Sequence, residues 1–68
     1  MLIGRSNPSA QKTAWANYRG RLRETLLLLN ENLEDAGDAG AREHIKRLIQ
    51  RHSGYLQRAE KRIAELSN

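Results

Sequence analysis

A run of four consecutive leucines, Leu26 to Leu29, constrains this chain more than any other feature. Successive residues of an α-helix are about 100° apart, so four neighbouring leucines cannot all lie on one side of a helix. Leu27 and Leu28 therefore point away from the main stripe and predict a partner, unless they lie half-exposed at its margin. The main stripe has alternating spacings of four and three residues and comprises Leu22, Leu26, Leu29, Leu33 and Ala36.

The length of 68 residues is the second constraint. A chain this short buries only about 60% of its unfolded surface. Disulfides, a metal or oligomerisation usually stabilise such a chain. It has no cysteine, which excludes disulfides and cysteine-based zinc sites. His44 and His52 are eight residues apart, and neither has an i, i+4 histidine. We therefore expect oligomerisation, with no metal and no cofactor.

Composition favours helices over strands. The chain has no valine, four isoleucines, two threonines and three aromatic residues, whereas β-proteins are enriched in β-branched and aromatic residues. Asn7 and Pro8 suit the start of a helix, and Gly37 and Asp38 suit the end of one helix and the cap of the next. We expect a flexible arm over 1–7 and one domain over 8–68, with helices at about 8–36 and 39–66 and a turn at 37–40.

The second helix has its own apolar seam, widened by Leu48 and Tyr55. Two helices of equal length joined by a short turn predict an all-α antiparallel hairpin, and a second hairpin packed face to face would complete a four-helix bundle. Gly20 either allows a close helix approach or is a tolerated defect, and Ser53-Gly54 is a point at which the second helix could kink. The seam comprises Ile45, Ile49, His52, Leu56, Ala59, Ile63 and Leu66.

Charge varies along the chain. The formal charge of +4 at pH 7 is the sum of +5 over residues 1–23, −5 over 24–44 and +4 over 45–68. In an antiparallel hairpin the first and last segments meet, so we expect a basic open end and an acidic turn end. Two such rods attract head to tail.

Four arginines form a line on the outer side of the second helix. Several arginines on one line would contact the phosphates of RNA or DNA, or an acidic protein, and the alternative is an ordinary solvated face. This candidate face comprises Arg47, Arg51, Arg58 and Arg62.

Trp15 and Tyr18 lie three residues apart and share a helix face. We expect them to pack over the second helix near Ile63 and Leu66, and a contact site for a separate partner is the alternative. The sequence carries no nucleophile with a base and no phosphate-binding loop after a strand, so no catalytic residue and no small-molecule substrate are predicted. Met1-Leu2-Ile3 is too short for a signal peptide, and no apolar run is long enough to span a membrane, so we expect a cytoplasmic protein.

Two segments resemble known families. Tyr55-Leu56-Gln57-Arg58-Ala59-Glu60-Lys61 looks like the start of the last helix of the microtubule-interacting and trafficking (MIT) domain, and Asn17-Tyr18 resembles the opening of that family's second helix. The likeness covers residues 17–66, and the family's first helix has no counterpart. It implies a groove that binds leucine-bearing helical tails. Lys12-Thr13-Ala14 before a leucine-rich helix is similar to the plasmid repressor-of-primer family, which implies a dimeric four-helix bundle that binds paired RNA loops.

These observations predict a non-enzymatic helical module that binds protein, as an adaptor or as an inhibitor of a larger machine, with a phage or plasmid origin fitting such a regulator. The alternative is an RNA- or DNA-binding regulator that uses the four arginines. A homodimer is the expected assembly. The predicted partner or dimer interface comprises Leu22, Leu26, Leu27, Leu28, Leu29, Leu33 and Tyr55.

Overall fold

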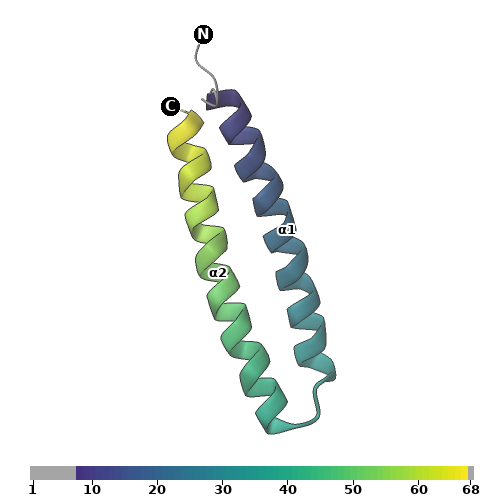
Figure 1. Cartoon of the computed structure of the whole chain (residues 1–68). Helices are drawn as coiled ribbons and strands as arrows, with labels where there is room; N and C mark the ends of the chain where they lie inside the picture. The colour runs from purple at the N-terminus through teal and green to yellow at the C-terminus, as the bar shows by residue number, and fades with distance from the viewer. Residues whose placement is uncertain (1–7, 68) are drawn as a thin grey trace.

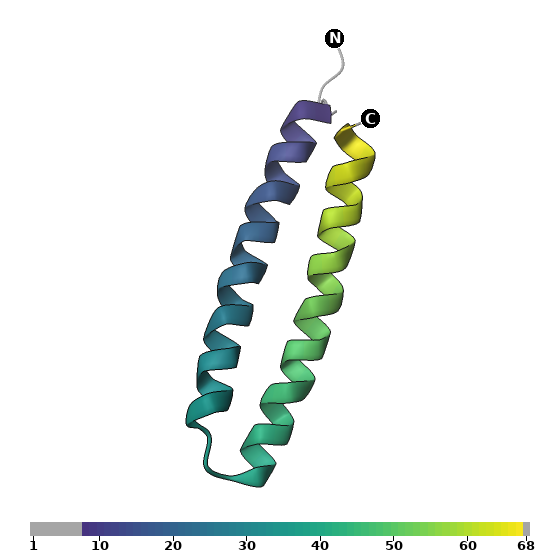
Figure 2. The same ribbon diagram turned by 180° about the vertical axis from the view of Figure 1, so that it is seen from behind.

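The computed structural model describes residues 8–67, and over that range the chain forms two antiparallel helices. α1 spans Pro8–Asp35 and α2 spans Ala39–Ser67, with 28 and 29 residues, together 57 of the 68. The helices lie side by side along their whole length (Figures 1 and 2). The predicted all-α helical hairpin is thus confirmed. The predicted arm over 1–7 and its Asn7 cap lie outside the described residues.

The turn is short because side chains satisfy both helix ends. Asp38 caps α2, since its Oδ2 accepts a hydrogen bond from the Ala41 N–H at 2.9 Å. At the other end, the Arg42 guanidinium donates to the carbonyl oxygens of Leu33 at 2.9 Å and Ala36 at 3.3 Å. These carbonyls lie at the C-terminal end of α1, where a helix runs out of backbone donors. The Asp38 cap starts α2 at Ala39, so Gly40 belongs to the helix rather than to the turn.

The two seams predicted from spacing meet between the helices. Leu22, Ala59 and Ile63 are the buried hydrophobic residues of the described chain, with exposed fractions of 5%, 0% and 9%. The rest of both seams is half-buried: Leu26, Leu29, Leu33, Ala36, Ile45, Ile49, His52, Leu56 and Leu66. Spacings of four and three residues on both helices are those of an antiparallel coiled coil.

Gly20 and Gly54, inside the helices, neither interrupt a helix nor bring the two helices closer together. α2 continues through Ser53 and Gly54 without interruption. A Cβ built at Gly20 or Gly54 meets nothing within 4 Å. Of the two explanations for Gly20, the structure therefore favours a tolerated defect over a close helix approach.

The hairpin is a thin rod. Its two helices, of 28 and 29 residues, are each about 42–44 Å long at a rise of 1.5 Å per residue.

Candidate interaction surfaces

The hairpin has two long edges along which side chains of α1 and α2 meet, and one of them is polar. Here Arg23 Nη2 and Glu60 Oε2 lie 3.3 Å apart, with side chains 58% and 46% exposed. An ion pair this exposed contributes only about 0–1 kcal/mol. It shows, however, which sides of the two helices face the same edge.

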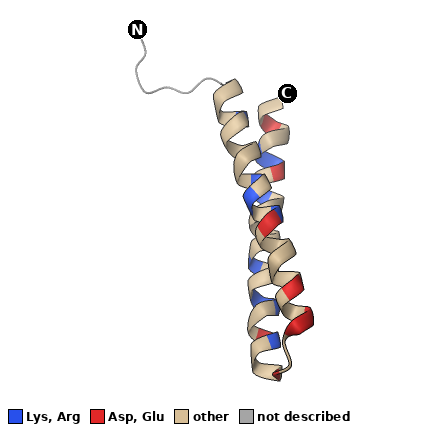
Figure 3. Ribbon diagram, turned by 90° about the vertical axis from the view of Figure 1, so that its right-hand side faces the viewer, with Lys and Arg blue, Asp and Glu red and all other residues tan. Residues whose placement is uncertain are grey.

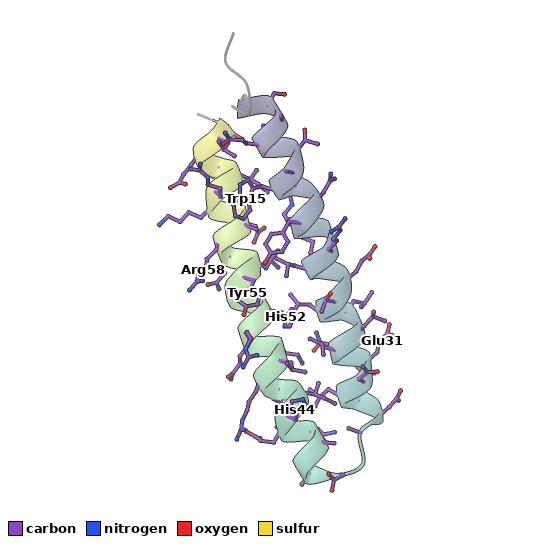
Figure 4. All side chains as sticks on the ribbon, in the orientation of Figure 1. Trp15, Glu31, His44, His52, Tyr55 and Arg58 are labelled. Atoms are coloured by element: carbon purple, nitrogen blue, oxygen red, sulfur yellow. The ribbon has the colours of Figure 1, made fainter. Side chains whose placement is uncertain are left out.

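The opposite edge is aromatic. Tyr18 lies five residues before Arg23, and Tyr55 lies five residues before Glu60. At about 100° per residue, five residues rotate a side chain by about 140° around the helix, which moves each tyrosine away from the polar edge to the opposite one. Each tyrosine makes an edge-to-face ring contact, Tyr18 with Trp15 at 5.8 Å and Tyr55 with His52 at 5.5 Å. Figure 4 shows Trp15, Tyr55 and His52 in this order from the open end of the hairpin toward the turn. We call the four residues the aromatic edge.

The aromatic edge is partly open. Tyr18 is 40% exposed and Tyr55 36% exposed, while Trp15 and His52 are half-buried. A shallow hollow lies against α1 and is lined by Ala14, Trp15 and Tyr18. Of the expected Trp15–Tyr18 pair, Trp15 therefore continues the α1 seam toward α2, and Tyr18 remains available for contact.

The leucines fall into two groups. Leu22, Leu26, Leu29 and Leu33 lie in the seam between the helices and are buried or half-buried. Leu27 and Leu28 are 61% and 58% exposed and lie on the outer side of α1, on opposite flanks. The residues predicted together as an interface thus occupy different places, and only Leu27, Leu28 and Tyr55 among them are exposed.

The arginine stripe of α2 is exposed along its whole length. Arg62 Nη1 lies 3.4 Å from Glu65 Oε1 one turn further on. Within residues 8–67, Arg47, Arg51 and Arg58 form no ion pair. Tyr55 lies between Arg51 and Arg58 in the sequence, so the stripe borders the aromatic edge. In Figure 4 Arg58 points outward from α2.

Acidic residues gather near the turn end of the hairpin. Figure 3 shows acidic residues gathered where α1 approaches the turn and basic residues along much of the rod. Glu31, Glu34 and Asp35 lie in the last turns of α1, Asp38 lies in the turn and Glu43 lies near the start of α2. Lys46 and Arg47 follow within the next turn of α2, so bases border this acidic end.

The histidines play separate structural parts. His52 Nδ1 lies 2.8 Å from the Leu48 carbonyl oxygen, and a carbonyl only accepts, so this nitrogen carries a proton. His44 is exposed one turn into α2. Across residues 8–67, no three His, Cys, Asp or Glu residues come together as a group that would hold a metal ion.

Comparison of the chain with protein-family models, with curated proteins and with solved structures gives no match. Neither segment that resembles the MIT domain opens a helix, because Asn17 lies within α1 and Tyr55 lies well inside α2. Neither helix of the described chain is long and apolar enough to cross a membrane.

Proposed function

We propose that this protein is a non-enzymatic interaction module, which acts by binding another helical surface as an adaptor or as an inhibitor of a larger protein assembly. One observation carries the proposal: Leu27 and Leu28 are 61% and 58% exposed on a hairpin with three buried hydrophobic residues in its described part. Full burial of a leucine contributes about 1.5–3 kcal/mol. Because both side chains are more than half exposed, the hairpin alone gains only part of that free energy.

The shape supports the same proposal. Two helices in contact leave their outer sides uncovered, including the outer side of α1 that carries Leu27 and Leu28. Helical faces with anchors at one-turn spacings are a recurrent means of protein recognition. The aromatic edge supplies tyrosine and tryptophan, which are enriched at binding hot spots.

Site-specific photo-cross-linking tests the proposal. A photoreactive phenylalanine derivative replaces Leu27, Leu28 or, as a control, the exposed α2 residue Gln50. In nuclease-treated host extract, positions 27 or 28 should give discrete protein adducts, including one at twice the 7.8 kDa mass if the partner is a second copy. Position 50 should give none of them. An identical pattern at all three positions, or no protein adduct, would contradict the proposal.

The unpaired arginines favour a second candidate function, the binding of RNA or DNA. Each phosphate that a protein neutralises contributes about 0.7–0.9 to the slope of log affinity against log salt. The four-arginine stripe therefore predicts a slope of about −2.8 to −3.6. Arg51→Ala should reduce that slope by about 1, and Lys46→Ala, on the polar edge, should leave it unchanged. Binding that does not change with salt would rule out this function.

A further inference from the structure

We propose that α1 carries a second heptad seam on its outer side, and that a second copy of this chain packs on it with the two α1 helices antiparallel and crossing at Leu28. The inference rests on the proposed interaction function and names the partner and the surface.

Each position of the second seam comes one residue before a position of the seam that packs on α2. Residues at alternating spacings of three and four from Leu28 lie on one side of α1. They are Thr25, Arg21 and Tyr18 toward the N-terminus, and Asn32 and Asp35 toward the C-terminus. This is the spacing of the seam that packs on α2, rotated by about 100° around α1. Leu28 is 58% exposed and Tyr18 40% exposed, so its two large apolar side chains are uncovered.

The seam is complementary to itself in one orientation. Arg21 and Asp35 each lie seven residues from Leu28, on either side of it. Seven residues are close to two helical turns, so both lie near the face of Leu28 and at equal distances from it. An antiparallel two-fold crossing at Leu28 therefore places Arg21 of each copy against Asp35 of the other.

The two charges are available for this pairing. Arg21 and Asp35 are both exposed, and within residues 8–67 neither forms an ion pair. A parallel arrangement of the two α1 helices would instead place arginine against arginine and aspartate against aspartate. The charges of the seam therefore favour the antiparallel arrangement.

The opposite flank of α1 fits a second copy less well. The flank of α1 that carries Leu27 also carries Arg23, which already pairs with Glu60.

Sedimentation equilibrium of two neighbouring variants provides the first test. Leu28→Ala and Leu27→Ala remove the same side chain from adjacent residues of similar exposure. The wild-type chain should dimerise, Leu28→Ala should weaken dimerisation at least tenfold, and Leu27→Ala should leave it within about twofold. Equal effects, or a larger effect at Leu27, would overturn the assignment of the seam.

A charge exchange provides the second test and fixes the orientation. Arg21→Asp alone and Asp35→Arg alone each place like charges across the two-fold axis, so each should weaken the dimer. The double variant restores opposite charges in both copies and should recover most of the affinity. Helical content by circular dichroism, unchanged in every variant, shows that each chain still folds. A double variant as weak as the worse single variant would overturn the antiparallel α1 pairing.

The two proposals fail in different ways. A wild-type monomer at hundreds of micromolar, with position-specific adducts of other proteins at Leu27 or Leu28, overturns the dimer and retains the interaction function. A dimer whose affinity changes as expected in neither the leucine test nor the charge-exchange test overturns the α1 seam alone. The absence of both a dimer and any protein adduct overturns the interaction function itself.

Discussion

Leu22 is the residue on which the α1–α2 contact depends most. It is 5% exposed, whereas Leu26 and Leu29 of the same seam are half-buried. Removing a buried leucine side chain costs about 2–5 kcal/mol, and the cost scales with the area and cavity involved. Leu22→Ala should therefore lower the free energy of unfolding by about 2–5 kcal/mol, and Leu26→Ala by about half as much. Urea denaturation at high dilution measures both, and equal losses would contradict this packing.

Arg42 links the two helices at the turn. It donates to the carbonyl oxygens of Leu33 and Ala36, and a cation there also stabilises the negative end of the α1 dipole. Arg42→Ala should destabilise the hairpin by about 1–2 kcal/mol, and Arg42→Lys should recover part of that loss. Exposed Arg47, without such a contact, serves as the control. Hydrogen exchange that does not accelerate in the last turn of α1 would show that the contact is dispensable.

At the scale of the helix, glycine is the weakest feature of the hairpin. Gly in a helix interior costs about 0.5–1 kcal/mol relative to Ala, and a Cβ at Gly20 or Gly54 meets nothing within 4 Å. Gly20→Ala and Gly54→Ala should each raise the midpoint of thermal unfolding by several degrees. At Gly40, a Cβ would lie 3.2 Å from the Asp38 carboxylate that caps α2. Gly40→Ala should therefore raise the midpoint of thermal unfolding by less than the other two substitutions. An equal rise for all three would contradict the Asp38 cap.

Local sequence patterns predicted the two helices and the turn, because the interactions that form them involve residues close together in the sequence. Leucine spacing predicted the seam, and Asp38 predicted the cap of α2, since each signal lies within a few residues of the structure that it forms. Features that join the two helices were not predictable in this way. The Arg42 cap, and the edge shared by Tyr18 and Tyr55, both require the register of α1 against α2.

At the scale of the whole molecule, charge should set orientation, and apolar burial should set affinity. In the antiparallel α1 pair, Asp35 in the acidic last turn of one copy approaches Arg21 of the other. Exposed pairs contribute about 0–1 kcal/mol each, so they select among arrangements more than they hold the dimer together. This selection should fade as the screening length falls from about 10 Å at 0.1 M salt to about 3 Å at 1 M.

Reversing the acidic turns separates these contributions. A variant in which Glu31, Glu34 and Asp35 all become lysine replaces attraction with repulsion at both ends of the α1 pair, while Leu28 and Tyr18 are unchanged. It should be monomeric at low salt and recover part of the dimer at about 1 M salt, because salt screens the repulsion and leaves apolar burial in place. The wild-type dimer should change little between the same conditions. Sedimentation at both salt concentrations decides the matter: a variant that stays dimeric at low salt places the acidic turns of α1 away from the interface.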